Sequence, residues 1–167
     1  MLVNRPSIPT VRRVQYARGF LELGMFAAAA KELDAIEGVA RIGADVMELQ
    51  VDLHMAARHW ELVVAMAQEF TARHPVEPQG WISRAFALRE LGCIREAKAV
   101  LLQAEPVHGK TCAVLHYNLA CYHCLLGEMQ QARDRLSQAC KMGKTWKREA
   151  RSDPDLKALW NDLPAIS

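Results

Sequence analysis

The hydrophobic pattern is clearest near the middle of the chain, where apolar residues recur at steps of three and four. Two such runs flank Gly92: Trp81, Ala85, Leu88 and Leu91 before it, and Ile94, Ala97, Val100, Leu101 and Ala104 after it. This spacing predicts two amphipathic helices. Gly92 lacks a Cβ and therefore suits the left-handed residue that ends a helix. Pro106 predicts the end of the second helix and a loop over "PVHGKT".

The same break recurs at a fixed interval. The segments "ELGMF", "AARHW", "ELGCI" and "LLGEM" place Gly24, Arg58, Gly92 and Gly127 at intervals of 34, 34 and 35 residues. A bulky apolar residue follows two positions later and a small or short one three positions after that: Phe26 and Ala29, Trp60 and Val63, Ile94 and Ala97, Met129 and Ala132. This period predicts a solenoid of helix pairs that share a continuous core. No segment has the alternation of a strand, so the predicted fold is all-α.

These positions resemble the tetratricopeptide repeat family, whose pattern is W-x2-L-G-x2-Y, then A-x3-F, then proline. The resemblance is weakest in the second unit. The matching residues are Ala17, Phe20, Ala29 and Leu33 in the first unit, Met47, Val51, Val63, Ala67 and Pro75 in the second, Trp81, Ala85, Leu88, Ala97 and Leu101 in the third, and Leu119, Ala120, Ala132 and Leu136 in the fourth. The chain departs from the pattern at Arg13, Arg84 and His116, where apolar residues are usual.

The resemblance implies a right-handed α-solenoid of about four helix-turn-helix repeats over residues 10–142. The expected units are about 10–43, 44–77, 78–111 and 112–143, preceded by an N-terminal extension (1–9) and followed by a C-terminal capping helix and tail (144–167). The capping helix is expected to begin at Asp153, with Pro154 in its first turn. It would cover the end of the solenoid with one apolar stripe: Leu156, Leu159, Trp160 and Leu163.

Ligands of tetratricopeptide repeat proteins usually lie in the concave groove lined by the first helix of each unit. The resemblance therefore implies a partner-binding site at Arg18, Glu48, Asp52, Ile82, Phe86, Arg89, Tyr117 and Cys121. Aromatic groups there could anchor a peptide, and the acidic residues could orient a basic ligand. One branch of the family grips acidic chaperone tails through lysines and asparagines. That clamp is not expected here, because the corresponding positions are Val14, Arg18, Leu49, Gln79 and Ser83.

The stretch "HYNLACYHCLLG" raises the question of metal or redox chemistry. His116 and His123 are seven residues apart, which is about 10 Å along a helix, so they cannot both ligate one ion. Cys121 and Cys124 would supply two of the four ligands that structural zinc needs. Packing is therefore the favoured interpretation, with no metal or cofactor expected. A metal-binding or redox-sensing role for the cysteine pair is kept as an alternative.

Net charge, hydropathy and cysteine content limit the partners and the location expected for the chain. The net charge of +2, from 21 basic and 19 acidic residues, gives no strong field, so nucleic acid is not expected as a partner. No stretch approaches the ~18 uninterrupted apolar residues of a membrane helix, and "MLVNRPSIPTVRR" does not read as a secretory signal. Five cysteines without an export signal are most simply reduced, which places the chain in the cytoplasm.

The expected function is a non-catalytic protein–protein interaction module, a scaffold or adaptor that binds a segment of a partner protein in the groove. No P-loop, serine-hydrolase or dinucleotide-binding motif occurs, so the chain is not expected to be an enzyme. A chaperone resembling those of type III secretion, with a membrane-inserting translocator as client, is an alternative on grounds of size and repeat content. Self-association into a homodimer is a further one.

Overall fold

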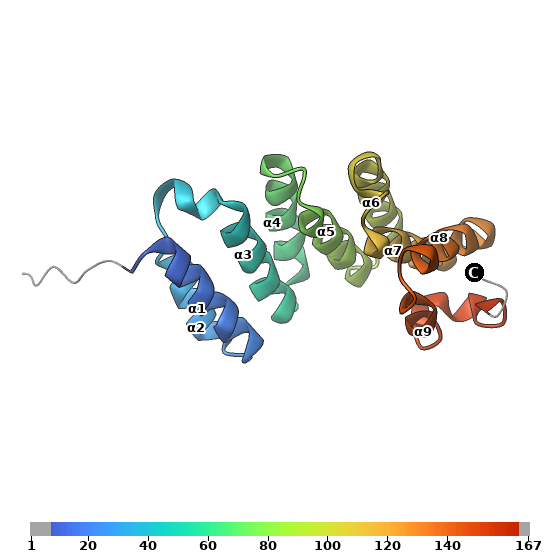
Figure 1. The fold of residues 1–167 in the computed structure, drawn as a ribbon, viewed down its shortest axis with the longest axis horizontal. Helices are drawn as coiled ribbons and strands as arrows, with labels where there is room; N and C mark the ends of the chain where they lie inside the picture. The colour runs from blue at the N-terminus through green and yellow to red at the C-terminus, as the bar shows by residue number, and fades with distance from the viewer. Residues whose placement is uncertain (1–7, 164–167) are drawn as a thin grey trace, which may run out of the picture.

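The chain forms four helix pairs in a row, followed by a shorter C-terminal segment (Figure 1). The computed structural model describes residues 8–163, so most of the predicted N-terminal extension (1–7) and the last residues of the predicted tail (164–167) lie outside it. The pairs are α1 (Thr10–Glu22) with α2 (Phe26–Asp34), α3 (Ala44–Ala56) with α4 (Trp60–Arg73), α5 (Pro78–Glu90) with α6 (Ile94–His108), and α7 (Ala113–Leu125) with α8 (Met129–Met142). The predicted all-α helical repeat fold is confirmed.

Three short helices complete the described chain. The 3-10 helix η1 (Gly38–Ile42) connects the first pair to the second, and α9 (Trp146–Ala150) and the 3-10 helix η2 (Pro154–Leu159) follow α8. No strand occurs between residues 8 and 163. Within the same range, no helix is both long enough and apolar enough to cross a membrane.

The turn inside each pair is made by one residue with positive φ. These residues are Gly24 (φ +70°), Arg58 (+58°), Gly92 (+78°) and Gly127 (+77°), which are the four positions of the repeated break. The backbone N–H one residue further on donates to a carbonyl five residues back in each turn, at 2.8–3.0 Å. This is the Schellman motif, which ends the first helix and reverses the chain.

Small side chains let the paired helices approach each other. Ala29, Val63, Ala97 and Ala132, at the predicted positions, are all fully buried. Successive first helices also pack on one another, α1 on α3, α3 on α5 and α5 on α7, whereas successive second helices barely touch. The array therefore curves with its first helices on the inner side. We call the surface formed by α1, α3, α5 and α7 the inner face.

The polar residues that depart from the family pattern have partners. The buried His116 in α7 donates from Nε2–H to the carbonyl oxygen of Gly109 at 2.7 Å, and its Nδ1 accepts from Arg135 at 3.2 Å. Because a carbonyl only accepts and a guanidinium only donates, His116 is the neutral tautomer with its proton on Nε2. The two arginines are also paired: Arg13 with Glu32, and Arg84 with Gln68.

Pro106 does not end α6, and the loop predicted over "PVHGKT" is wrong in its first half. The helix continues to His108. Proline in the last turn removes only one backbone bond, to the carbonyl of Leu102, and water can replace that bond because Leu102 is exposed. The end of the helix is then held by the buried His108, whose Nε2–H donates to the carbonyl oxygen of Pro75 at 3.1 Å.

The segment after α8 folds back onto the fourth pair, and we call residues 143–163 the C-terminal cap (Figure 1). It contains α9 and η2 rather than the single helix expected, and η2 packs on α7. The side chain of Asp153 accepts from the N–H of Asp155 at 2.9 Å, so the expected helix start is present. Most of the expected apolar stripe is buried in the core shared with α7, and Trp160 is its exposed member: the buried ones are Leu156, Leu159 and Leu163.

Candidate partner-binding site

Two hollows lie along the inner face. The first, of about 540 Å³, lies between α1 and α3 and is lined by apolar groups such as Val14 and Val46 together with the charged Arg18 and Asp45. The second, of about 270 Å³, lies between α5, α7 and the C-terminal cap. Three predicted site residues line this second hollow: Phe86, Arg89 and Cys121.

An acidic pair that forms no ion pair lies on α3. Glu48 and Asp52 are one helical turn apart, and no ion pair joins either of them to a basic group within residues 8–163. Burial raises the pKa of Asp52, and the neighbouring charge of Glu48 raises it further, while Arg18 acts in the opposite direction. The pair therefore concentrates negative charge in partly buried surroundings, where a cation from outside would be attracted strongly.

Phe86 is the exposed aromatic group on α5. Its side chain is 38% exposed, and its ring meets Trp60 edge-on with centroids 5.9 Å apart. Ile82, one turn earlier, is partly buried against the core. An aromatic ring fixed by a second aromatic ring offers a rigid apolar contact at little entropic cost, which is the property of a good binding anchor.

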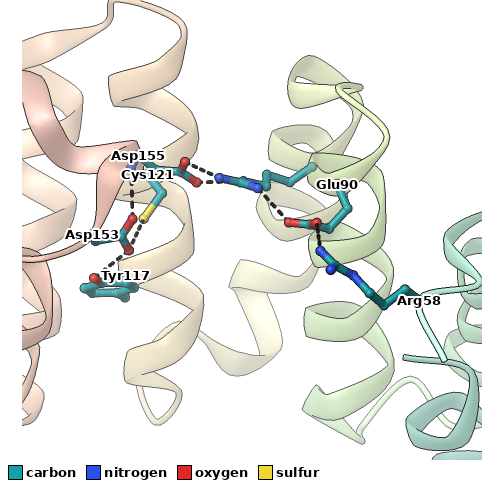
Figure 2. A network of polar contacts seen from close by, with 7 residues as sticks. Arg58, Glu90, Tyr117, Cys121, Asp153 and Asp155 are labelled. Carbon is teal, nitrogen blue, oxygen red and sulfur yellow. Dashed lines mark hydrogen bonds and ion pairs between the residues drawn. The ribbon is translucent and has the colours of Figure 1, made fainter. Parts of the chain in front are cut away.

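A chain of polar contacts crosses from the second unit to the C-terminal cap (Figure 2). Arg58 at the turn between α3 and α4 reaches Glu90 at 3.9 Å, and Glu90 also accepts from Arg89 at 2.6 Å. Arg89 in turn holds both carboxylate oxygens of Asp155, with Nε at 2.7 Å from Oδ2. These bonds raise the pKa of the Arg89 guanidinium. Arg89 is thus committed to contacts inside the chain.

The C-terminal cap covers Tyr117 and Cys121 of α7. The hydroxyl of Tyr117 donates to Asp153 at 2.8 Å, and its ring lies 4.9 Å from that of Trp146. The Sγ of Cys121 lies 3.7 Å from the same carboxylate (Figure 2). Both side chains are buried. The fourth unit's share of the inner face is therefore occupied by the chain itself.

Ligand atoms of Cys121, Asp153 and Asp155 lie within 4.8 Å of one another, a group of the kind that holds metal ions. The guanidinium of Arg89 already neutralises Asp155, and Asp153 accepts from Tyr117 and from a backbone N–H. Burial also raises the pKa of the Cys121 thiol, as it does for Cys124. Metal ligation and thiol exchange both need the thiolate, which this environment disfavours. The arrangement stabilises the docked cap.

The sequence contains one pattern that could have predicted the docking of the C-terminal cap on α5 and α7. "SDPD" combines a helix start with two carboxylates, and Arg89 lies one turn after Phe86 on the inner face. The hydrogen bond between Arg89 and Asp155 joins residues 66 positions apart. A repeat period of 34 or 35 residues does not predict such a contact. The two groups of predicted residues thus have different surroundings. Arg89, Tyr117 and Cys121 contact the C-terminal cap, whereas the other predicted residues lie on α1, α3 and α5 and make none of these contacts: Arg18, Glu48, Asp52, Ile82 and Phe86.

Comparisons with known proteins agree with this architecture. TTC0263, a thermophilic tetratricopeptide repeat protein of Thermus thermophilus, superimposes with a TM-score of 0.68 at 16% identity, over 95% of this chain and 82% of that one. A MamA structure gives a TM-score of 0.73 at 12% identity, over 94% and 87%. MamA of AMB-1 gives 0.66 at 12% identity, over 93% and 85%.

The sequence matches no protein-family model, and no curated protein matches it. The likeness therefore rests on structure, on the period of the turns and on the residues that fill the helix interfaces. At these identities a superposition establishes the fold, and it covers nearly the whole chain. The protein is a helical solenoid with the fold of the tetratricopeptide repeat proteins.

Proposed function

We propose that the chain is a non-catalytic protein-interaction module that binds a segment of a partner protein along the open part of the inner face, over α1, α3 and α5. The observation that carries this proposal is the acidic pair Glu48 and Asp52. Its carboxylates form no ion pair within residues 8–163, and the charge of Arg18 only partly offsets theirs, although most charged groups around Arg89 are paired. A partly buried acidic pair costs stability, and a basic ligand would offset that cost.

The proposal specifies the chemistry of the ligand. A lysine or arginine would meet Glu48 and Asp52, and an apolar side chain would pack on Phe86 and Ile82. The first hollow, with Arg18 at its edge, would receive the neighbouring part of the segment. Affinity would come from these few anchors rather than from the whole contact area.

Contacts of a partner with Arg89, Tyr117 and Cys121 stay a prediction that requires the C-terminal cap to move. Three leucines of the cap are buried in the core, and burying one such side chain is worth about 1.5–3 kcal/mol. In this proposal the cap is therefore a fixed end of the groove, held by these three residues.

The alternatives predict different ligands. A type III secretion-like chaperone would bind an apolar translocator segment, for which the acidic pair supplies no attraction. A metal or redox sensor would need reactive Cys121 and Cys124. All five cysteines are free in the structure, which supports the proposed placement in the reducing cytoplasm. Light scattering on the purified chain would show whether a homodimer forms.

Site-specific crosslinking in the native cell tests the proposal. A photoreactive phenylalanine would replace Phe86 in one variant and Leu102 of α6 in another. The two positions are matched, because their side chains are 38% and 39% exposed, but they lie on a first and a second helix. The proposal predicts one partner segment, rich in basic residues, crosslinked at position 86 and not at 102. Equal crosslinking at both positions, or the reverse preference, would contradict it.

A further inference from the structure

Two histidines face each other at the turn that ends α3. His54 lies in the last turn of the helix and His59 lies just after the reversal. The backbone N–H of His59 donates to the carbonyl oxygen of His54 at 3.0 Å, which brings the two side chains together. Their Nδ1 atoms are 3.4 Å apart, while the ring centroids are 5.7 Å apart. The Nδ1 edges of the rings therefore point toward each other.

The equivalent positions in the other units show what is unusual here. A Schellman turn commonly has an apolar contact between these two positions, and the first and third units have apolar residues there: Phe20 and Met25, and Leu88 and Cys93. In the fourth unit, His123 pairs with the carboxylate of Glu128. Only the second turn places two imidazoles there, and neither packing nor an ion pair accounts for them.

The remaining histidines are all engaged elsewhere. His116 and His123 have the partners described above, and His74 and His108 donate to the carbonyl oxygens of Ile42 and Pro75 at 2.7 and 3.1 Å. In the part of the chain that the structure describes, the ring nitrogens of His54 and His59 have only each other as hydrogen-bond partners. In the neutral pair, one Nδ1–H can donate to the lone pair of the other Nδ1, and both Nδ1 lone pairs face each other when each ring carries its proton on Nε2.

The turn is also held in a costly conformation. Arg58, between the two histidines, has φ +58° and is the one non-glycine residue with positive φ between residues 8 and 163. Its guanidinium lies 5.8 Å from the ring centroid of Trp60 and 3.9 Å from Glu90. Strained backbone is retained where surrounding contacts fix it, and it concentrates at functional sites.

We propose that His54 and His59 chelate a divalent transition-metal ion through their two Nδ1 atoms. Two metal–nitrogen bonds of about 2.0–2.1 Å at a tetrahedral angle place the nitrogens about 3.4 Å apart, which is the separation found here. Imidazole pairs suit zinc, nickel and copper. The remaining coordination positions belong to water.

Burial lowers the pKa of His54, and the neighbouring His59 lowers it further, while Asp34 raises it. This site lies on a different turn from Cys121 and the C-terminal cap. It goes beyond the proposed function, because it needs no partner protein.

Histidine-selective NMR on the full chain, reduced and stripped of metal, tests the proposal. Zinc would be added while the ring ¹⁵N resonances of all six histidines are followed. We expect the Nδ1 resonances of His54 and His59 to move together and to saturate at one equivalent, with the other four unchanged. Nickel titration by calorimetry would give the affinity, and His59→Gln should weaken binding at least ten-fold. His74→Gln is the matched control, because glutamine can still donate to Ile42, and its affinity should equal that of wild type.

Each other outcome overturns the proposal. Zinc that leaves the His54 and His59 resonances in place while the chain still binds it would assign the ion to the thiols. If neither zinc nor nickel binds saturably, the two histidines form only a contact with each other. Equal nickel affinity in wild type and His59→Gln would exclude the chelate directly.

Discussion

Arg89 of α5 and Asp155 of the C-terminal cap form a two-point ion pair between residues 66 positions apart in the sequence. The pair joins the third repeat to the segment that covers the fourth. It fixes where the open part of the inner face ends, and so it separates the proposed ligand site over α1, α3 and α5 from the buried surroundings of Tyr117 and Cys121.

Removing this pair should destabilise the chain. Arg89→Ala leaves Asp155, whose side chain is 13% exposed, without its cation, and we expect the free energy of unfolding to fall by about 1.5–3 kcal/mol. Urea unfolding would measure it. A double-mutant cycle with Asp155→Ala isolates the pair, and strictly additive effects of the two substitutions would contradict a direct coupling.

The cap should protect the Cys121 thiol. Leu156→Ala removes a fully buried side chain from the core between η2 and α7, so we expect a loss of about 2–5 kcal/mol in unfolding free energy. Transient opening of the cap should then speed the reaction of Cys121 with a thiol reagent. Lys157→Ala changes the adjacent exposed residue and is the control. An unchanged Cys121 rate in Leu156→Ala would mean that the cap does not shield the thiol.

Arg58→Gly should stabilise the second turn. Glycine adopts the φ of +58° found there without strain, whereas the ion pair of Arg58 with Glu90 is long and its arginine side chain is 75% exposed, so its loss costs little. We expect a rise in Tm of about 2–4 °C for a chain of this length. Gly92→Ala, at the equivalent third turn, should lower Tm. An unchanged or lower Tm in Arg58→Gly would show that the contacts of Arg58 outweigh the strain.

Asp52→Asn should weaken binding of the proposed basic ligand and raise the stability of the folded chain. The pKa of Asp52 is raised by burial and by Glu48, so protonation favours the folded state. The stabilising effect of protonation is present below the ordinary value of 3.8 and is lost as pH rises through the folded-state pKa. At neutral pH the variant should therefore melt at a higher temperature than wild type, by about 1–3 °C. Its advantage should disappear in acid. A lower Tm at pH 7 would contradict the unpaired state of Asp52.

The contribution of Glu105 to stability should depend on pH in the opposite direction. The hydrogen bond from Arg135 lowers its pKa, against the effect of burial. Its contribution is present above the ordinary value of 4.5 and is lost as pH falls through the folded-state pKa. Glu105→Gln should thus melt below wild type at pH 7, and the two melting curves should converge toward pH 3. A constant difference across that range would exclude the linkage.

Periodic features of this fold could be predicted from sequence because they are local. Each turn needs one residue in the left-handed region, and each helix interface needs one small side chain, so Gly24 and Ala29 carry their signal within a few positions. The placement of Glu48, Asp52 and Phe86 on first helices follows from the same register. The fold and the pairing of helices could be predicted from the sequence for this reason.

Features that depend on contacts between residues far apart in the sequence could not be predicted from the repeat pattern. The path of the C-terminal cap is set by Arg89, Tyr117 and the apolar surface of α7 acting on one acidic turn. Pro106 is tolerated in α6 because His108 finds the carbonyl of Pro75 from the preceding unit. Such contacts join residues more than 30 positions apart, and a repeat pattern contains no information on them.

The affinity of the chain for the segment crosslinked at position 86 should follow the charges on the two sides of the interface. Glu48→Lys together with Asp52→Lys should weaken binding at least ten-fold, and the matched Glu61→Lys on α4 should leave it unchanged. Replacing the basic residue of the segment by glutamate should restore affinity for the double variant. Undiminished binding by the double variant, or no recovery with the exchanged segment, would contradict a ligand held by the acidic pair of the inner face.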